Sequence, residues 1–72
     1  MDMDIVYTMH ANEQIKERKL LKVWVEETIK SPDQTKAKGH KYYATKKLNG
    51  KTLRVIYVKE KYIKVITSYF VK

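Results

Sequence analysis

The sequence has no cysteine and no long hydrophobic run, and both absences limit what the chain can be. Without cysteine, the chain can form neither a disulfide framework nor a thiolate metal site, which suits a reducing compartment such as the cytoplasm. No apolar segment approaches the roughly 20 residues that cross a bilayer. Residues 1–15 also lack the apolar stretch of a signal peptide. We therefore expect a cytoplasmic protein with no membrane partner.

Acidic residues are nearly absent from the second half of the chain. Residues 1–35 hold five Lys or Arg and seven Asp or Glu, whereas residues 36–72 hold eleven Lys or Arg and one acid, Glu60. The net charge of +8 therefore comes from the second half. A one-sided positive field suits a polyanionic partner, most simply nucleic acid. The alternative is that the lysines serve solubility and keep sheet edges from pairing with other chains.

Glycine and proline are scarce, and those present mark the ends of elements. Asn49-Gly50 predicts a type I′ hairpin, because both central residues of that turn need a positive φ. Strands are expected at about residues 3–7, 40–48, 51–59 and 61–71.

Two helices are expected after the first strand, at about residues 9–18 and 21–30. The Thr8 hydroxyl is expected to cap the first helix. Spacing i, i+3, i+4, i+7 and i+8 predicts an inward stripe on the second helix: Leu21, Trp24, Val25, Thr28 and Ile29. Pro32 ends that helix, and residues 33–39 are expected to form a polar loop.

The element order β-α-α-β-β-β predicts an α+β fold in one domain, residues 1–72. Two helices are expected to pack on one face of an antiparallel sheet. The last three strands form a meander.

Turn lengths predict how the strands of the meander pair. The Asn49-Gly50 loop pairs Thr45 with Arg54, and a two-residue Glu60-Lys61 loop pairs Arg54 with Thr67. Period-2 alternation then separates two faces. The face expected to pack on the helices carries Tyr42, Ala44, Leu48, Leu53, Val55, Tyr57, Ile66 and Phe70. The expected open face carries Tyr43, Thr45, Lys47, Arg54, Ile56, Val58, Val65, Thr67 and Tyr69. A longer second turn would shift this pairing.

The expected open face combines cations, hydroxyls and aromatic rings in a pattern that suits single-stranded RNA. Two rows are predicted on it: Thr45, Arg54 and Thr67, and beside them Lys47, Thr52 and Tyr69. The Arg54 guanidinium offers forked donors that match phosphate oxygens. Tyr43 and Tyr69 can stack on unpaired bases. The alternative is that the Arg54 stem packs on the sheet with its head in water, and that the tyrosines and threonines are ordinary strand residues.

His10 is the candidate general acid or base, because an imidazole titrates near neutral pH. It lies in the first turn of the first helix, where packing at a helix end is an equal alternative. His40 opens a strand and reads as a loop-end residue. Two histidines so far apart, without a carboxylate cluster, predict no metal site. No cofactor motif is present.

Several short motifs, in this order, resemble a known family: His10-Ala11, Glu17-Arg18 with Leu20, Val25-Glu26-Glu27 with Pro32, Leu53-Arg54-Val55-Ile56-Tyr57, and Val65-Ile66-Thr67-Ser68-Tyr69. Over about residues 9–70 the chain resembles a family of small bacterial domains of unknown function that is usually placed beside RelE/ParE-type toxins. RelE-like toxins pack a helical hairpin on an antiparallel sheet. Many of them cleave messenger RNA, often on the ribosome, by attack of a 2′-oxygen on phosphate.

The resemblance implies roles for individual residues. Arg54 matches an arginine that these toxins carry on the central strand. His10, Arg18 and Thr67 match a histidine, an arginine and a threonine of the unknown-function family. That family often has an arginine where this chain has Gln14. The basic, tyrosine-containing tail of active RelE toxins has no counterpart before Lys72, which favours binding over cleavage.

Three functions follow as hypotheses. The first is a toxin-like RNA-binding domain of a toxin–antitoxin system, with metal-independent ribonuclease activity left open. In it His10, Arg54, Thr67 and Tyr69 are the candidate catalytic residues, and Arg18, Tyr43, Thr45 and Lys47 the candidate RNA-binding residues. The second is a non-enzymatic module that binds an acidic protein such as an antitoxin. The third is a ParE-like inhibitor of a DNA enzyme.

Overall fold

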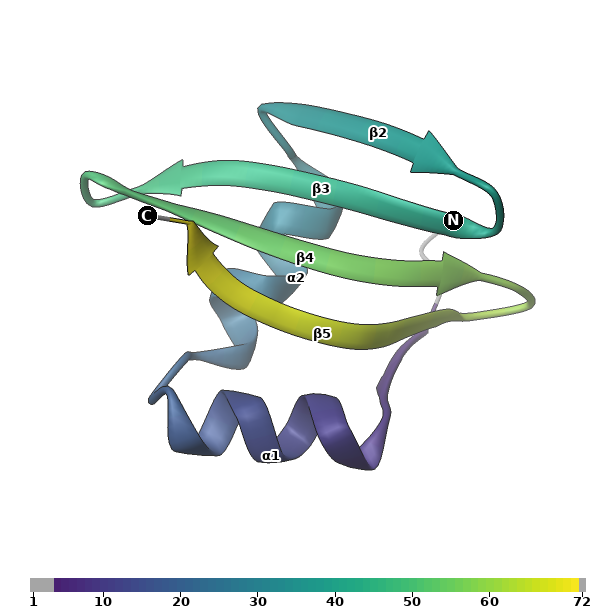
Figure 1. Cartoon of the computed structure of the whole chain (residues 1–72), viewed down its shortest axis with the longest axis horizontal. Coiled ribbons are helices and arrows are strands. Elements are labelled where there is room, and N and C mark those ends of the chain that lie inside the picture. Colours follow the sequence, from purple (N-terminus) through teal and green to yellow (C-terminus); the bar gives the residue numbers. More distant parts are fainter. Residues whose placement is uncertain (1–3, 72) are drawn as a thin grey trace.

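The computed structural model describes residues 4–71, which form two helices and one five-stranded sheet (Figure 1). The elements are β1 (Ile5–Tyr7), α1 (Met9–Glu17), α2 (Lys22–Lys30), β2 (Gln34–Lys38), β3 (Lys41–Leu48), β4 (Lys51–Lys59) and β5 (Ile63–Val71). The strand order is β1-β5-β4-β3-β2. This confirms the α+β class and the C-terminal meander. Of the predicted first strand, Met3 lies outside the described residues.

The sheet is mixed rather than antiparallel throughout. β1 pairs with β5 in parallel, and the other three pairs of strands are antiparallel. A short parallel strand fits here because α1 and α2 separate β1 from the meander in sequence. In Figure 1, α2 lies behind the sheet and α1 runs alongside β5, so no helix within residues 4–71 covers the front face of β2, β3 and β4.

The two ends of α1 are set by local hydrogen bonds. At its start the Thr8 hydroxyl accepts a 3.0 Å hydrogen bond from the N–H of Ala11, which confirms the predicted N-cap. At its end the N–H of Leu20 donates to the carbonyl of Ile15 at 2.9 Å, and Lys19 takes a left-handed φ of 55°. This Schellman arrangement turns Leu20 into the core.

The predicted inward stripe of α2 is wrong at its first residue. Leu21 is 51% exposed and is the N-cap of α2, whereas Val25, Thr28 and Ile29 are buried as expected. The side chain that enters the core at this joint is Leu20, at 5% exposure. The Schellman turn of α1 determines which of the two leucines points inward. A prediction from helical periodicity does not include this turn.

The polar loop predicted at residues 33–39 is wrong. Residues 34–38 form β2, an edge strand that pairs with β3 through Gly39-His40. Gly39 adopts a φ of 63°, as the first residue of a type II′ turn requires. Every residue of β2 is exposed, so its sequence carries no apolar alternation. Pairing with β3 alone holds it in the sheet.

The first hairpin of the meander confirms the predicted register. Asn49 and Gly50 have φ values of 51° and 81°, which a type I′ turn requires. Leu48 pairs with Lys51, and Thr45 pairs with Arg54.

The second hairpin does not have the predicted register. Lys59 pairs with Ile63, so the loop has three residues, and a β-bulge then skips Ile66. Together these shift the pairing by two positions, and Arg54 lies opposite Tyr69 instead of Thr67. Thr67 pairs with Ile56, and the predicted Lys47, Thr52 and Tyr69 row ends in Val71 instead.

The longer loop also changes the predicted faces in the first part of β5. Val65 was expected on the open face but is fully buried against the helices, because the three-residue loop pairs it with Tyr57 instead of Ile56. Ile66 was expected to face the helices but is the extra, half-buried residue of the bulge. The core on the helix side is otherwise as predicted for β3 and β4. Its buried hydrophobic residues are Ala11, Ile15, Leu20, Val25, Ile29, Ala44, Leu53, Val55, Tyr57, Ile63 and Val65.

The aromatic contacts of the core lie on the helix side of the sheet. Tyr42 and Tyr57 stack with their ring centroids 5.3 Å apart, and Trp24 meets Phe70 edge to face at 6.2 Å. Neither helix in residues 4–71 is long and apolar enough to cross a membrane.

Candidate functional site

One row of polar side chains crosses four strands on the open face of the sheet. The register places Gln34 of β2, Thr45 of β3, Arg54 of β4 and Tyr69 of β5 directly opposite one another in turn. Neighbouring strands lie about 4.8 Å apart, so the row spans about 14 Å. The Thr45 hydroxyl donates to the carbonyl of Gln34 at 3.4 Å. The row therefore presents amide, hydroxyl, guanidinium and phenol groups along one line.

Arg54 and Tyr69 form the centre of this row. Arg54 Nη1 lies 3.3 Å from the Tyr69 hydroxyl and donates to it, and the Arg54 Cζ lies 5.9 Å from the centroid of the tyrosine ring. Both side chains are half-buried. A guanidinium carries five N–H donors in one plane. One bond to Tyr69 is therefore compatible with a bidentate grip on a phosphate.

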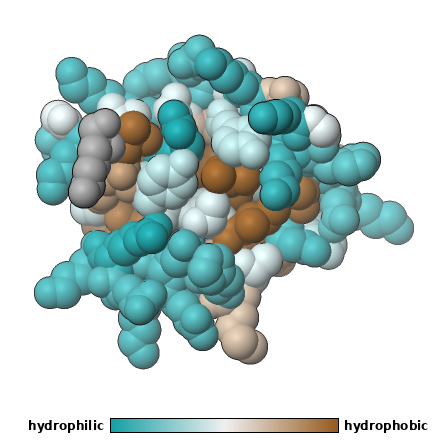
Figure 2. Space-filling view, viewed as in Figure 1, coloured by the Kyte–Doolittle hydropathy of each residue, from teal (hydrophilic) through white to brown (hydrophobic). Residues whose placement is uncertain are grey.

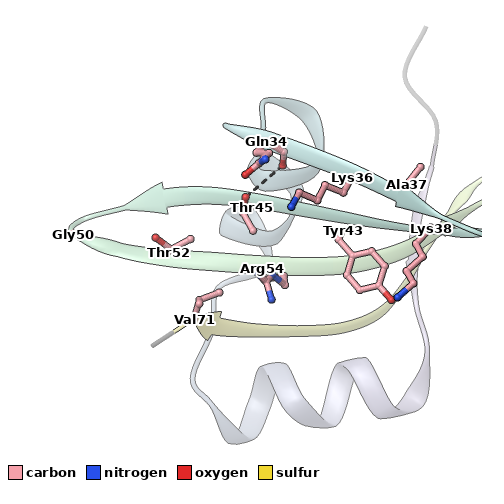
Figure 3. A pocket seen from close by; sticks show the side chains of 10 residues that line it. All are labelled: Gln34, Lys36, Ala37, Lys38, Tyr43, Thr45, Gly50, Thr52, Arg54 and Val71. Carbon is pink, nitrogen blue, oxygen red and sulfur yellow. Dashed lines mark hydrogen bonds between the residues drawn. The ribbon is translucent and has the colours of Figure 1, made fainter.

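The row opens into a hollow of about 830 Å³ (Figure 3). Its lining residues are Gln34, Lys36, Ala37, Lys38, Tyr43, Thr45, Gly50, Thr52, Arg54 and Val71. Three of these carry positive charge and none carries a carboxylate. In Figure 3 the side chains of Lys36, Tyr43 and Arg54 all lie on the same side of the sheet. The hollow is thus a positively charged site with an aromatic ring inside it.

Further rows extend the same pattern across the open face. Lys36 and Tyr43 share a row with Ile56 and Thr67, about 7 Å further along the strands. The register puts six cations on this face and no Asp or Glu of β2 to β5: Lys36, Lys38, Lys41, Lys47, Arg54 and Lys64. Figure 2 shows hydrophobic side chains near the middle of the face with hydrophilic ones around them. The face is basic, with an apolar centre.

Two predicted site residues, Thr67 and Arg18, instead form hydrogen bonds at the contact between α1 and β5. The Thr67 hydroxyl donates to Oε1 of Gln14, and the N–H of Ser68 donates to the same oxygen at 3.3 Å. Arg18 Nη1 donates to the carbonyl of Ser68 at 2.8 Å. Thr67 and Arg18 therefore contribute to the α1–β5 contact, and neither is in the Arg54 row.

The two histidines lie away from the Arg54 row. His10 is exposed in the first turn of α1, one helical turn before Gln14 and on the same side of the helix. His40 is in the β2–β3 turn and lines a second hollow of about 290 Å³ with Gly39, Tyr42, Val58, Lys59 and Glu60. Within residues 4–71, no three His, Cys, Asp or Glu side chains come together as metal ligands do.

The two tyrosines with a shifted pKa belong to the core. Burial raises the pKa of Tyr7 to about 12, and the Glu26 carboxylate, 3.3 Å from the Tyr7 hydroxyl that donates to it, adds to the rise. Burial, and then the neighbouring Tyr42, raises the pKa of Tyr57. Both phenols pack on the helix side and stabilise the fold in their protonated form.

The structure therefore assembles part of the predicted site. Thr45, Arg54 and Tyr69 come together in one row, with Tyr43 and Lys47 in the flanking rows. Sequence reasoning missed the contributions of β2 to the hollow, which are Gln34, Lys36 and Lys38. The signal available for them was the alternation of polar side chains in Gln34-Thr35-Lys36-Ala37-Lys38, which puts both lysines on the face of Gln34.

The fold and the site define the class of protein: an α+β domain with one face covered by helices and one open, basic face. Residues 7–70 match the family described as a domain of unknown function, DUF4258. Because that match spans most of the chain, the protein belongs to this family. The comparisons with curated proteins and with solved structures gave no match.

Proposed function

We propose that this domain binds single-stranded RNA on the open face of its sheet. The observation that carries the proposal is the Arg54 row, set in a hollow that the described residues line with three cations and no carboxylate. In the proposed complex Arg54 grips a phosphate through two parallel hydrogen bonds, while Lys36 and Lys38 lie against neighbouring phosphates. Thr45 and Gln34 supply uncharged contacts to sugar or base.

A single strand fits this face better than a duplex. Tyr43 and Tyr69 lie on either side of Arg54, on β3 and β5, and both are half-buried among cations. Unpaired bases stack on such rings, which adds about 1–3 kcal/mol per base. A duplex keeps its base faces covered, so it gains only the phosphate contacts.

The proposal extends to a toxin-like protein related to RelE and ParE. Two observations support it: the helical pair packs against a C-terminal meander, and the arginine of the central strand lies in the basic hollow. Where the bound strand is cleaved, its 2′-oxygen bonds to phosphorus and its hydroxyl proton passes to water. The bond from phosphorus to the 5′-oxygen breaks. Arg54 stabilises the charge that develops on the phosphate oxygens.

Tyr69 is the proton donor that the row favours in such a reaction. Because Arg54 donates to the Tyr69 oxygen, the phenol proton remains to be given to the leaving 5′-oxygen. His10 and Thr67, also predicted as catalytic, are less well placed, since one is exposed on α1 and the other donates to Gln14.

Equilibrium titration with a labelled RNA tests the binding proposal. Arg54→Ala is expected to weaken binding of single-stranded RNA about tenfold to a hundredfold, because it removes a charge-assisted contact worth about 1.5–3 kcal/mol. The matched control is Lys30→Ala, which removes one charge from the exposed end of α2 on the helix side. It should change affinity less than about threefold, since it alters only the long-range field. Equal losses in both variants would contradict a site at Arg54.

An acidic protein partner is the second candidate function. Ile56 and Val58 give the open face its apolar centre, and Lys41 and Lys64 lie in the same row as Val58. An apolar patch with a charged rim is typical of protein interfaces. In that case an acidic peptide binds as tightly to Arg54→Ala as to the wild type, and Val58→Glu abolishes binding. Loss of peptide binding in a folded Arg54→Ala variant would contradict this candidate.

A further inference from the structure

The edge of β5 that faces away from β4 has two different partners along its length. Its first part, residues 63–65, pairs with β1. Residues 67–68 pair with β4 on one side, but within residues 4–71 no strand lies beside them on the β1 side, where Gln14 and Arg18 contact them instead. The change of partner falls at Ile66, the residue that the β-bulge leaves out of the β4–β5 pairing.

Side chains of α1 and of its C-cap residue, Arg18, take the place of the missing strand at this edge. The N–H and the carbonyl of Ser68, which an edge partner would otherwise engage, bind Gln14 Oε1 at 3.3 Å and Arg18 Nη1 at 2.8 Å. Gln14 Oε1 also accepts from the Thr67 hydroxyl. One glutamine oxygen therefore holds the two residues that directly follow the bulge.

The bulge decides which side chain of β5 faces Arg54. If the pairing of Tyr57 with Val65 continued without a bulge, Ser68 would lie opposite Arg54. A shift of one residue exchanges the two faces of a strand, so Tyr69 would then turn toward the helices. In the bulged register Ser68 is fully buried on the helix side and Tyr69 lies on the open face. The Arg54–Tyr69 pair thus depends on the bulge.

We infer that Gln14, supported by Arg18, is a positioning residue that holds the bulged register of β5 and so places Tyr69 opposite Arg54. Bulges are known to re-aim side chains next to functional sites. The contacts of Gln14 lie on α1, outside the RNA-binding face, so it acts on that face only through β5. The consequence for RNA binding rests on the proposed function, whereas the consequence for the register does not.

The register is tested first, without RNA, by nuclear magnetic resonance of the full chain. In the wild type, backbone contacts between Arg54 and Tyr69 are expected, as is slow exchange of the Ser68 amide. In Gln14→Ala both are expected to weaken, because the amide and the Thr67 hydroxyl lose their acceptor. Gln14→Glu should retain both, since a carboxylate also accepts from two donors. The matched control is Glu13→Ala, an exposed neighbour on α1, which should resemble the wild type.

A double-mutant cycle on RNA affinity then separates positioning from general stability. Gln14→Ala is expected to weaken binding about tenfold in the wild-type background and less than about twofold in the Tyr69→Ala background. A merely structural role would reduce affinity equally in both. Should Gln14→Ala fail to fold, Thr67→Val removes only the hydroxyl contact and is expected to show the same pattern in smaller degree.

The outcomes are distinct. Retention of the Arg54–Tyr69 contact in Gln14→Ala, or equal affinity losses in the two backgrounds, would overturn the inference. A wild-type protein that does not bind RNA would overturn the proposed function, while loss of the Arg54–Tyr69 contact in Gln14→Ala would still support the positioning role.

Discussion

Ser68 is a polar residue that the fold buries completely. Its side chain lies on the helix side opposite Val55, and its hydroxyl finds no hydrogen-bond partner within residues 4–71. The N–H of the same residue donates to Gln14, and its carbonyl accepts from Arg18. The hydroxyl thus adds a desolvation cost without a compensating bond.

Ser68→Ala is therefore expected to raise the free energy of unfolding by about 1 kcal/mol, since it removes an unsatisfied buried hydroxyl and little volume. Urea unfolding of both proteins measures the difference. Destabilisation by more than about 1 kcal/mol would show that the hydroxyl has a favourable partner.

Tyr7 makes stability depend on alkaline pH. Its pKa is raised from 10.0 to about 12, so the folded state holds the phenol proton more tightly than the unfolded chain does. The stabilisation is therefore complete below pH 10 and is lost as the pH rises toward 12. Comparing the unfolding free energies of the wild type and Tyr7→Phe across this range isolates Tyr7 from the titrating lysines. The difference should shrink as the pH rises, and a constant difference would contradict this account.

Among the candidate site residues, Arg54 was predictable because it is the one charged side chain inside an otherwise apolar run of β4. Its neighbour Tyr69 was placed on the correct face but in the wrong row, because the partner of Arg54 depends on the bulge. Thr67 was predicted as a catalytic residue and Arg18 as an RNA-binding residue, but Thr67 donates to Gln14 and Arg18 donates to the carbonyl of Ser68. Strand periodicity cannot anticipate contacts from a helix that lies far away in sequence.

At the scale of elements, the joint between α1 and α2 contains a strained residue. Lys19 adopts a φ of 55° at the position after the C-cap, where glycine is strongly preferred. A side chain in this left-handed region costs about 1–2 kcal/mol.

Lys19→Gly is thus expected to stabilise the domain by about 0.5–1 kcal/mol, the strain relief less the entropy that glycine adds to the unfolded chain. Thermal unfolding is a suitable measurement. The control, Lys16→Gly in the helical part of α1, should destabilise by about 1 kcal/mol. Destabilisation by Lys19→Gly would show that the lysine side chain makes a stabilising contact that outweighs the strain.

The elements differ in how far sequence predicts them. The Asn49-Gly50 hairpin was predictable with its register, because a two-residue turn with two positive φ values has one geometry. The β4–β5 hairpin was not, because Glu60-Lys61-Tyr62 carries no such signature and one residue more changes the pairing. β2 was not predicted, because an exposed edge strand needs no apolar residues and so leaves no hydrophobic pattern in the sequence.

At the scale of the whole molecule, the uneven distribution of charge along the sequence becomes a difference in charge between the two faces of the sheet. The helices hold most of the acids of the described chain, whereas the strands β2 to β5 contribute six cations to the open side. This arrangement produces a directional positive field. It is the property through which a small domain attracts a polyanion at long range.

The central claim, that RNA phosphates bind the open face at Arg54, is tested most directly by the salt dependence of affinity. For single strands the slope of log K against log salt is about −0.7 for each phosphate contact. Arg54→Ala is predicted to make the slope shallower by about 0.7 relative to the wild type, whereas Lys30→Ala leaves it unchanged. Identical slopes for the wild type and Arg54→Ala would mean that no phosphate binds at Arg54 and would contradict the account.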